Sequence, residues 1–201
     1  MTPEILLFDI GNVILPLRLD RFQAAVDRAV PGSPADSWNR LYLDPASDAF
    51  ERGAIGRGAF RQAAARVLGA IFGPAEFEEL YCALFDGTTS GLEGALGGLA
   101  GRYRLALLSN TNAIHADYFI SRHGELFDRF EPEARFYSHE LGLRKPEEAI
   151  FREVLRRLGA PAEKVRFFDD SPANVASASR LGIDAVLIPS PAAILGELQR
   201  L

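Results

Sequence analysis

Four short runs of apolar residues constrain the fold of this 201-residue chain more than any other feature. Each run is continuous rather than alternating, which is typical of strands buried on both faces of a parallel sheet. The first three runs lead directly into a polar residue: Asp9, Ser109 and Asp169. The runs cover residues 5–8, 105–108, 165–168 and 185–188. We therefore expect a buried parallel sheet with polar groups at the ends of its strands.

Amphipathic helical patterns separate the later runs. Pro146 is expected to be the first residue of one helix and Pro172 of the next, with Ser171 as a possible N-terminal cap. Gly159 and Gly182 follow these patterns and are expected to end the two helices. The alternation of strand and helix predicts an α/β fold, a Rossmann-like doubly wound parallel sheet.

The segment 17–87 interrupts this alternation. It contains helical patterns near residues 22–29, 59–68 and 77–84 but no convincing strand. We expect a helical cap, inserted after the first strand, over the carboxyl ends of the strands where open α/β sheets bind ligands. The catalytic core would then comprise residues 1–16 and 88–201. Candidates in the cap for contacting the organic part of a substrate are Trp38, Arg40, Tyr42, Asp44 and Arg52.

Composition excludes several classes of function. A formal net charge of −5 offers no basic patch for nucleic acid and no polybasic face for an anionic membrane. The N-terminus lacks the basic segment of a secretory signal, and the run 5–8 is too short to span a bilayer. Cys82 is the only cysteine, so a cysteine-based metal cluster is excluded. We expect a cytoplasmic protein that acts on a small molecule.

Two polar segments follow the first two runs. Asp9 is followed by Gly11 and Asn12, which tolerate unusual backbone angles and can form a tight loop that projects the carboxylate. Ser109 and Asn110 follow the second run, where a hydroxyl and backbone N–H groups at the start of a helix can hold a phosphate. Each segment alone is also compatible with an ordinary turn or helix cap.

Two further segments carry charge. Lys145 is one of two lysines beside twenty arginines, and it precedes a predicted helix from which it could reach phosphate oxygens. Asp169 and Asp170 are adjacent carboxylates at the end of a strand, and their mutual repulsion calls for a nearby cation. Oxygen ligands favour a hard divalent ion, Mg²⁺ above all.

In this order, the four segments resemble the signature motifs of the haloacid dehalogenase superfamily, and the resemblance runs from residue 5 to about 188. The strings FDIGNVI, LSNTN, SHELGLRKPEEAIF and FFDDSPANV resemble most closely the bacterial α-D-glucose-1-phosphate phosphatase subgroup. They are more distantly similar to the phosphatase lobe of soluble epoxide hydrolase. FERGAIGRGAF resembles the small cap of this subgroup.

The resemblance implies a role for each motif residue. Asp9 would be the nucleophile that forms an aspartyl-phosphate. Ser109 and the backbone N–H of Asn110 would hold a phosphoryl oxygen, and Lys145 would neutralise the phosphate. The implied activity is that of a phosphatase acting on a small phosphorylated metabolite.

The resemblance also implies a set of ligands for Mg²⁺. Asp9, Asp170 and the backbone carbonyl of Gly11 would bind the ion. Asp169 would support it through water or a second hydrogen bond, although the two adjacent aspartates could exchange roles. Asn174 would orient the loop that carries them.

The chain departs from the family pattern at Gly11, where most family phosphatases carry a second aspartate that protonates the leaving group. General acid–base catalysis contributes about 10²–10⁴ in rate. A chain that lacks this acid is expected to favour esters whose leaving group needs little protonation. A sugar 1-phosphate is such an ester and is the expected substrate. The alternatives are a metal-independent 2-haloacid dehalogenase and a catalytically weak regulatory protein that binds a phosphometabolite.

Overall fold

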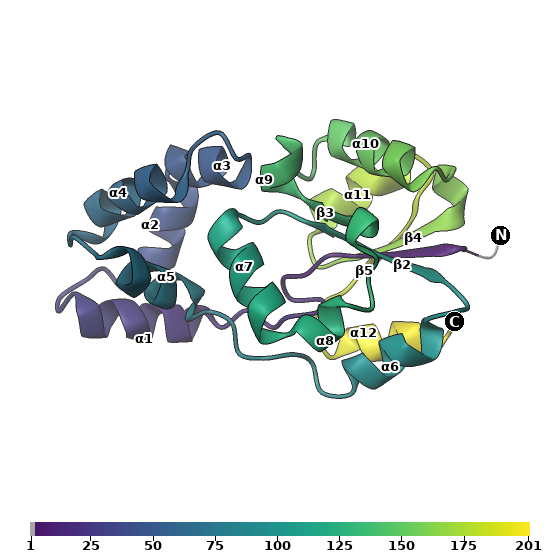
Figure 1. Cartoon of the computed structure of the whole chain (residues 1–201), viewed down its shortest axis with the longest axis horizontal. Helices are drawn as coiled ribbons and strands as arrows, with labels where there is room; N and C mark the ends of the chain where they lie inside the picture. The colour runs from purple at the N-terminus through teal and green to yellow at the C-terminus, as the bar shows by residue number, and fades with distance from the viewer. Residues whose placement is uncertain (1–2) are drawn as a thin grey trace.

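A parallel five-stranded sheet in the order β3-β2-β1-β4-β5 forms the centre of the protein (Figure 1). The computed structural model describes residues 3–201. Residues 1 and 2 lie outside the described residues. The predicted core range 1–16 and the prediction about a secretory signal both include these two residues. The strands are β1 (Ile5–Phe8), β2 (Arg104–Ser109), β3 (Arg135–Tyr137), β4 (Val165–Asp169) and β5 (Asp184–Leu187). The α/β fold and the four expected strands are confirmed.

The edges of the sheet differ from expectation. Strand β3 was not predicted, because three residues are too few to give a periodic signal. The run 185–188 was expected to be a buried strand, but β5 is an edge strand that pairs only with β4. Leu187 is consequently 43% exposed, and the next residue, Ile188, is buried.

Alternate residues of the central strand serve two separate hydrophobic layers. Leu6 and Phe8 face one layer, and Ile5 and Leu7 face the other. The first layer includes side chains of α6 (Leu92–Leu99), α7 (Ala113–Arg122), α8 (Gly124–Phe127) and α12 (Ala193–Leu198). The second includes side chains of α10 (Glu148–Leu158) and α11 (Pro172–Arg180). The sheet is thus covered on both faces, as its continuous apolar strands require.

The helix that follows Lys145 begins later than expected. Pro146 lies in a turn, and α10 starts at Glu148, so the prediction that Pro146 is its first residue is wrong. The Asn110 side chain binds both the N–H and the C=O of Lys145, and this holds the backbone in a turn. Gly159 ends α10 with a φ of +66°, as predicted.

Helix α11 starts at Pro172, as predicted. Ser171 occupies the N-cap position, but its side chain makes no capping hydrogen bond. Gly182, just after the helix, has the positive φ of +86° expected of a residue that ends it.

Five helices and no strand form within residues 17–87. Figure 1 shows them gathered at one end of the molecule, beside α7 and the short helix α9 (Ser138–Leu141). Two of the five were not predicted, because each has only seven residues. The division into core and cap itself stays a prediction. The five are α1 (Leu19–Ala29), α2 (Ser37–Leu43), α3 (Pro45–Glu51), α4 (Arg57–Leu68) and α5 (Pro74–Cys82).

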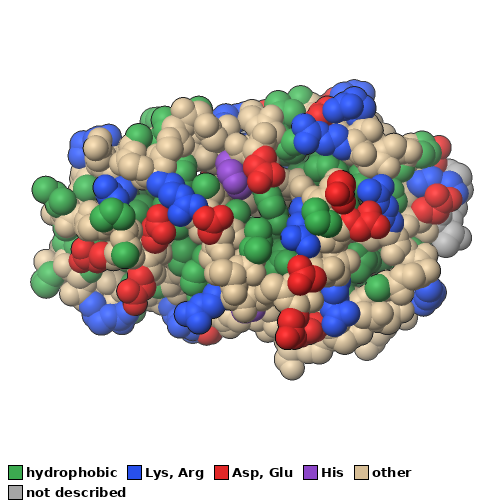
Figure 2. Space-filling view, viewed as in Figure 1, with side chains coloured by type: hydrophobic (Ala, Val, Ile, Leu, Met, Phe, Trp, Pro, Cys, Tyr) green, Lys and Arg blue, Asp and Glu red, His purple; other side chains and the backbone are tan. Residues whose placement is uncertain are grey.

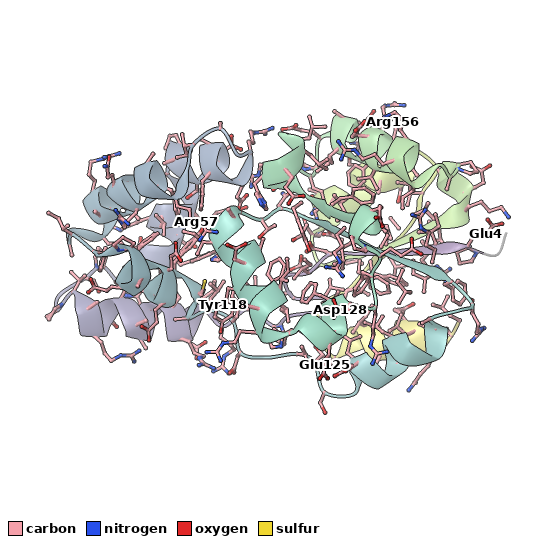
Figure 3. The ribbon with its side chains drawn as sticks, viewed as in Figure 1. Glu4, Arg57, Tyr118, Glu125, Asp128 and Arg156 are labelled. Atoms are coloured by element: carbon pink, nitrogen blue, oxygen red, sulfur yellow. The ribbon has the colours of Figure 1, made fainter. Side chains whose placement is uncertain are left out.

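Aromatic packing holds the five helices together, and polar contacts tie them to the rest. Phe60 stacks on Phe50 at 4.4 Å between ring centroids. Figure 3 shows Arg57 beside α7, where its guanidinium donates to the Ala113 carbonyl at 3.1 Å and pairs with Asp117.

On the face shown in Figure 2, acidic and basic side chains are interspersed. None of the helices between residues 3 and 201 combines the length and hydrophobicity needed to cross a bilayer.

Candidate active site

The ends of three neighbouring strands bring the predicted polar residues together. Phe8 of β1 pairs with Leu107 of β2 and with Phe168 of β4, so the residues that follow meet at one edge of the sheet. The Asp9 N–H donates to the Phe168 carbonyl at 2.9 Å. Asp9 and Asp169 are buried at this edge.

Lys145 reaches into this cluster from the loop before α10. Its ammonium nitrogen lies 2.8 Å from Asp9 Oδ1, 2.6 Å from Asp169 Oδ2 and 2.9 Å from the Leu108 carbonyl oxygen. An ammonium group has three donors, and here three acceptors surround it. This geometry accounts for a lysine at this position in a chain that has twenty arginines and only one other lysine.

Burial and neighbouring charges have opposite effects on the pKa values of Asp9 and Lys145. Burial raises the pKa of Asp9 to about 7, although Lys145 acts to lower it. Burial also acts to lower the pKa of Lys145, but Asp9 and Asp169 outweigh it and the net pKa is raised. Lys145 is therefore a buried cation that lies between two carboxylates and holds the pKa of Asp9 below the value that burial alone would give.

Every oxygen of Asp169 is already engaged. Oδ1 accepts from the Ser171 N–H at 2.8 Å and from Asn174 Nδ2 at 2.9 Å. Oδ2 accepts from Lys145 at 2.6 Å and from Asn174 Nδ2 at 3.1 Å. Asp169 and Asn174 thus hold the β4–α11 loop and the lysine in place.

Asp170 is less buried than Asp169. Its Oδ2 accepts a 3.0 Å hydrogen bond from Asn12 Nδ2. Asn12 adopts a φ of +55°, in the left-handed region, and its Oδ1 accepts from the Leu17 N–H at 3.1 Å. The tolerance of Asn for this backbone region lets the loop after β1 turn back toward Asp170.

The carboxylates fit a divalent ion with oxygen ligands. Oxygen atoms of Asp9, Asp169 and Asp170 lie within 4.8 Å of one another. Three carboxylates near a single ammonium leave an excess of negative charge, and hard cations such as Mg²⁺ prefer oxygen donors of this kind.

Asn110 connects the second and third motifs in a way that the sequence does not reveal. Its Nδ2 donates to the Lys145 carbonyl at 2.8 Å, and its Oδ1 accepts from the Lys145 N–H at 2.8 Å. The sequence assigned Asn110 only a backbone contact with phosphate. Its side chain fixes the backbone of the lysine beside the carboxylate cluster.

A cavity of about 150 Å³ lies beside this cluster. Gly11 lines it from the loop after β1 and Ser109 from the end of β2, and residues of α2 and α3 line another side. A Cβ at position 11 would lie 3.1 Å from Leu17 Cδ1, so a glycine fits closely there. The remaining lining residues are Ile10, Leu17, Trp38, Tyr42, Glu51, Leu84, Phe85, Asn110, Thr111, His115 and Phe119.

His115 forms part of this wall as a neutral group. Burial lowers its pKa to about 3. Nε2 is 3.2 Å from the Tyr81 carbonyl oxygen, Nδ1 is 3.3 Å from Asn112 Nδ2, and the ring stacks on Tyr81. Both ring nitrogens are engaged, so the imidazole packs the wall and is not a free base.

Comparison with known families decides the classification. A family model described as haloacid dehalogenase-like hydrolase matches residues 4–182. The chain belongs to the haloacid dehalogenase-like hydrolases. The resemblance of the four motifs to this superfamily is thereby confirmed, while the subgroup stays a prediction.

Solved structures of other haloacid dehalogenase-like (HAD) hydrolases share the whole fold. A HAD family enzyme from Bacteroides thetaiotaomicron superposes with a TM-score of 0.83 at 25% identity, covering 93% of this chain and 94% of that one. The same enzyme in complex with magnesium and inorganic phosphate gives a TM-score of 0.82 at 25% identity, over 92% and 93% of the chains. A predicted HAD-like hydrolase from Porphyromonas gingivalis gives 0.79 at 26%, over 93% and 91%.

Two further matches carry less information about this chain. A 2-haloacid dehalogenase from Pseudomonas syringae has a TM-score of 0.69 at 19% identity, over 100% and 99% of the chains, which shows the fold alone. Among curated proteins, a drimenol cyclase from Aspergillus calidoustus is 45% identical over 62 residues, 31% of this chain. That match spans only 11% of the cyclase.

Proposed function

We propose that this hydrolase is a Mg²⁺-dependent phosphatase that removes phosphate from a small metabolite through an aspartyl-phosphate on Asp9. The observation that carries the proposal is the meeting of three carboxylates and a buried lysine at the carboxyl edge of the sheet. The magnesium and phosphate bound by the Bacteroides enzyme support it.

Mg²⁺ would be held by Asp9, Asp170 and the Gly11 backbone carbonyl. Asp170 suits direct binding because, among the described residues, its carboxylate accepts a side-chain hydrogen bond only from Asn12, whereas both carboxylate oxygens of Asp169 are engaged. The ion would supply positive charge that lets an anionic carboxylate approach an anionic phosphoryl group.

The protein's own groups account for the remaining chemistry. An Asp9 carboxylate oxygen attacks phosphorus, and the bond to the leaving oxygen breaks with its electron pair on that oxygen. Ser109 and the Asn110 N–H hold a phosphoryl oxygen, while Lys145 offsets the negative charge. Water then attacks phosphorus, and the P–O bond to Asp9 breaks with its electron pair on the carboxylate. Inorganic phosphate leaves, and a proton from the water passes to the solvent.

Gly11 bears on the choice of substrate. No side-chain acid stands at this position, so leaving groups that need little protonation are favoured. We infer that a sugar 1-phosphate or an aryl phosphate reacts faster than a primary alkyl phosphate.

Phosphate release from a panel of esters tests the proposed function. Glucose 1-phosphate, glucose 6-phosphate and phenyl phosphate are each incubated with Mg²⁺ or with EDTA. We expect Mg²⁺-dependent release that is fastest for the 1-phosphate and the phenyl ester. Faster release from glucose 6-phosphate would contradict the role given to Gly11. No release from any ester would contradict a phosphatase and favour dehalogenation or a binding role.

The two adjacent aspartates are expected to differ when each is replaced. Asp170→Asn should raise the Mg²⁺ concentration for half-maximal activity by about 100-fold, because a direct ligand is lost. Asp169→Asn should chiefly lower the melting temperature, because Lys145 loses a buried partner. Mg²⁺ titration and thermal unfolding in EDTA measure the two effects. A raised Mg²⁺ requirement in Asp169→Asn alone would reverse the assignment.

A further inference from the structure

One side chain joins the two loops that carry the proposed Mg²⁺ ligands Gly11 and Asp170. Asn12 directly follows Gly11 in the loop after β1, and its Nδ2 donates to Asp170 Oδ2 at 3.0 Å across 158 positions of the chain. Asn12 takes no part in the proposed chemistry. It nevertheless contacts one proposed ligand and is joined by a peptide bond to the other.

The surroundings fix the direction of the Asn12 amide. A backbone N–H can only donate a hydrogen bond, and an ionised carboxylate can only accept one. The Leu17 N–H, 3.1 Å away, must therefore face Oδ1, and Nδ2 is left for the Asp170 carboxylate. Leu17 is held in turn by an antiparallel bridge to Phe85. The amide is thus anchored at its oxygen and presents its donor to Asp170.

The backbone at position 12 restricts which residues can make this connection. Asn12 has a φ of +55° and is the only non-glycine residue between positions 3 and 201 with a positive φ. Glycine, asparagine and aspartate adopt this region more readily than most residues. Of these three, only asparagine has a side-chain donor for a carboxylate.

The side chain of Asp170 depends on this bond, whereas that of Asp169 does not. Lys145 and the loop before α11 engage both carboxylate oxygens of Asp169. Among the described residues, Asp170 accepts a hydrogen bond from Asn12 at Oδ2 and none at Oδ1. One oxygen is thus held and the other is left for a cation. Groups that hold a metal ligand in this way commonly raise the affinity of the site.

We propose that Asn12 is a positioning residue that sets the affinity of the protein for Mg²⁺ by orienting the Asp170 carboxylate. The inference rests on the Mg²⁺ site of the proposed function. It adds a residue that acts on the ion only through one of its ligands. Loss of the amide lets the Asp170 carboxylate rotate, and Mg²⁺ binding then has to restrict that rotation.

A second amide in the chain provides a matched control. Gln23 in α1 accepts from the Ser37 N–H at 3.1 Å and donates to Asp27 Oδ1 at 2.8 Å, the same pattern of contacts as that of Asn12. Gln23 does not line the cavity beside the carboxylate cluster. Asn12→Gly and Gln23→Ala each remove such an amide without straining the backbone, because glycine suits a positive φ and alanine suits a helix.

Calorimetric titration with Mg²⁺ alone, in the absence of substrate, measures the effect. Asn12→Gly should raise the Kd for Mg²⁺ by about 10- to 100-fold, the usual result of losing a group that orients a metal ligand. Gln23→Ala should keep the Kd of wild type. Thermal unfolding in EDTA should show a small loss of stability in both variants, because each loses hydrogen bonds of the same kind. With phenyl phosphate, kcat of Asn12→Gly should return to the wild-type value once Mg²⁺ saturates.

Three results would overturn the inference: an unchanged Kd in Asn12→Gly, an equal rise in Gln23→Ala, or a kcat of Asn12→Gly that stays low at saturating Mg²⁺. The last would mean that the whole loop after β1 had moved. The titration requires no turnover. If wild type binds Mg²⁺ but releases no phosphate, the proposed reaction fails and the titration still decides the role of Asn12. If wild type binds no Mg²⁺, the metal site and this inference fail together.

Discussion

Asp9→Asn should abolish phosphate release without harming the fold. An amide cannot act as the attacking oxygen nucleophile, and loss of a nucleophile lowers kcat by at least about 10⁴-fold. Asparagine has nearly the same shape, and Lys145 keeps Asp169 and the Leu108 carbonyl as partners. Steady-state release of phosphate from phenyl phosphate with saturating Mg²⁺ measures the loss.

The same variant should be at least as stable as wild type at neutral pH in EDTA. Burial raises the pKa of Asp9 to about 7, above its ordinary value of 3.8, so folding favours the protonated form. The ionised side chain therefore destabilises the fold at and above pH 7, and this penalty fades as the pH falls toward 4. Asparagine removes the penalty. Thermal unfolding in EDTA that showed a clear loss of stability, or full activity in the variant, would contradict this account.

Lys145→Met should impair both stability and activity. Methionine keeps the length of the side chain but leaves Asp9 and Asp169 buried without their cation. Removing one partner from a buried ion pair costs about 3–5 kcal/mol. For a chain of this length, that corresponds to a fall in Tm on the order of 10 °C. Loss of a charge-stabilising group should also lower kcat by about 10²–10³-fold.

Lys164→Met is the matched control, since Lys164 is the only other lysine in the sequence. Its ammonium pairs with Glu4 at 2.6 Å on the surface, with side chains 35% and 66% exposed. Exposed pairs contribute about 0–1 kcal/mol, so this variant should resemble wild type. The instability of Lys145→Met should lessen as the pH falls below 7, because burial raises the pKa of Asp9 and its unpaired carboxylate can bind a proton. Equal stability of the two methionine variants in EDTA would contradict the buried-cation role.

The sequence predicts the part of the site that depends on strand ends. Continuous apolar runs marked β1, β2 and β4, and parallel strands place their carboxyl ends at one edge. Asp9 and Asp169 could therefore be expected to meet. Their chemical roles remain proposals.

The parts that the sequence could not predict depend on side chains far apart in the chain. The hydrogen bonds between Asn110 and Lys145 join residues 35 positions apart, and a polar pair of this kind leaves no periodic signal. The same holds for the ion pair between Glu51 and Arg144. Asp169 and Asp170 are adjacent residues of the same type, so the sequence alone does not distinguish their roles. Their different hydrogen-bond partners do.

The central claim is that Asp9 carries the phosphoryl group during turnover. Wild-type protein is mixed with phenyl phosphate and Mg²⁺, quenched within one turnover in cold acid, and digested for mass spectrometry of the peptide that contains Asp9. We expect a phosphoryl group on Asp9 that requires Mg²⁺ and is absent from Asp9→Asn. Rapid release of phosphate with an unmodified Asp9 peptide, or with phosphate attached to another residue, would contradict the account.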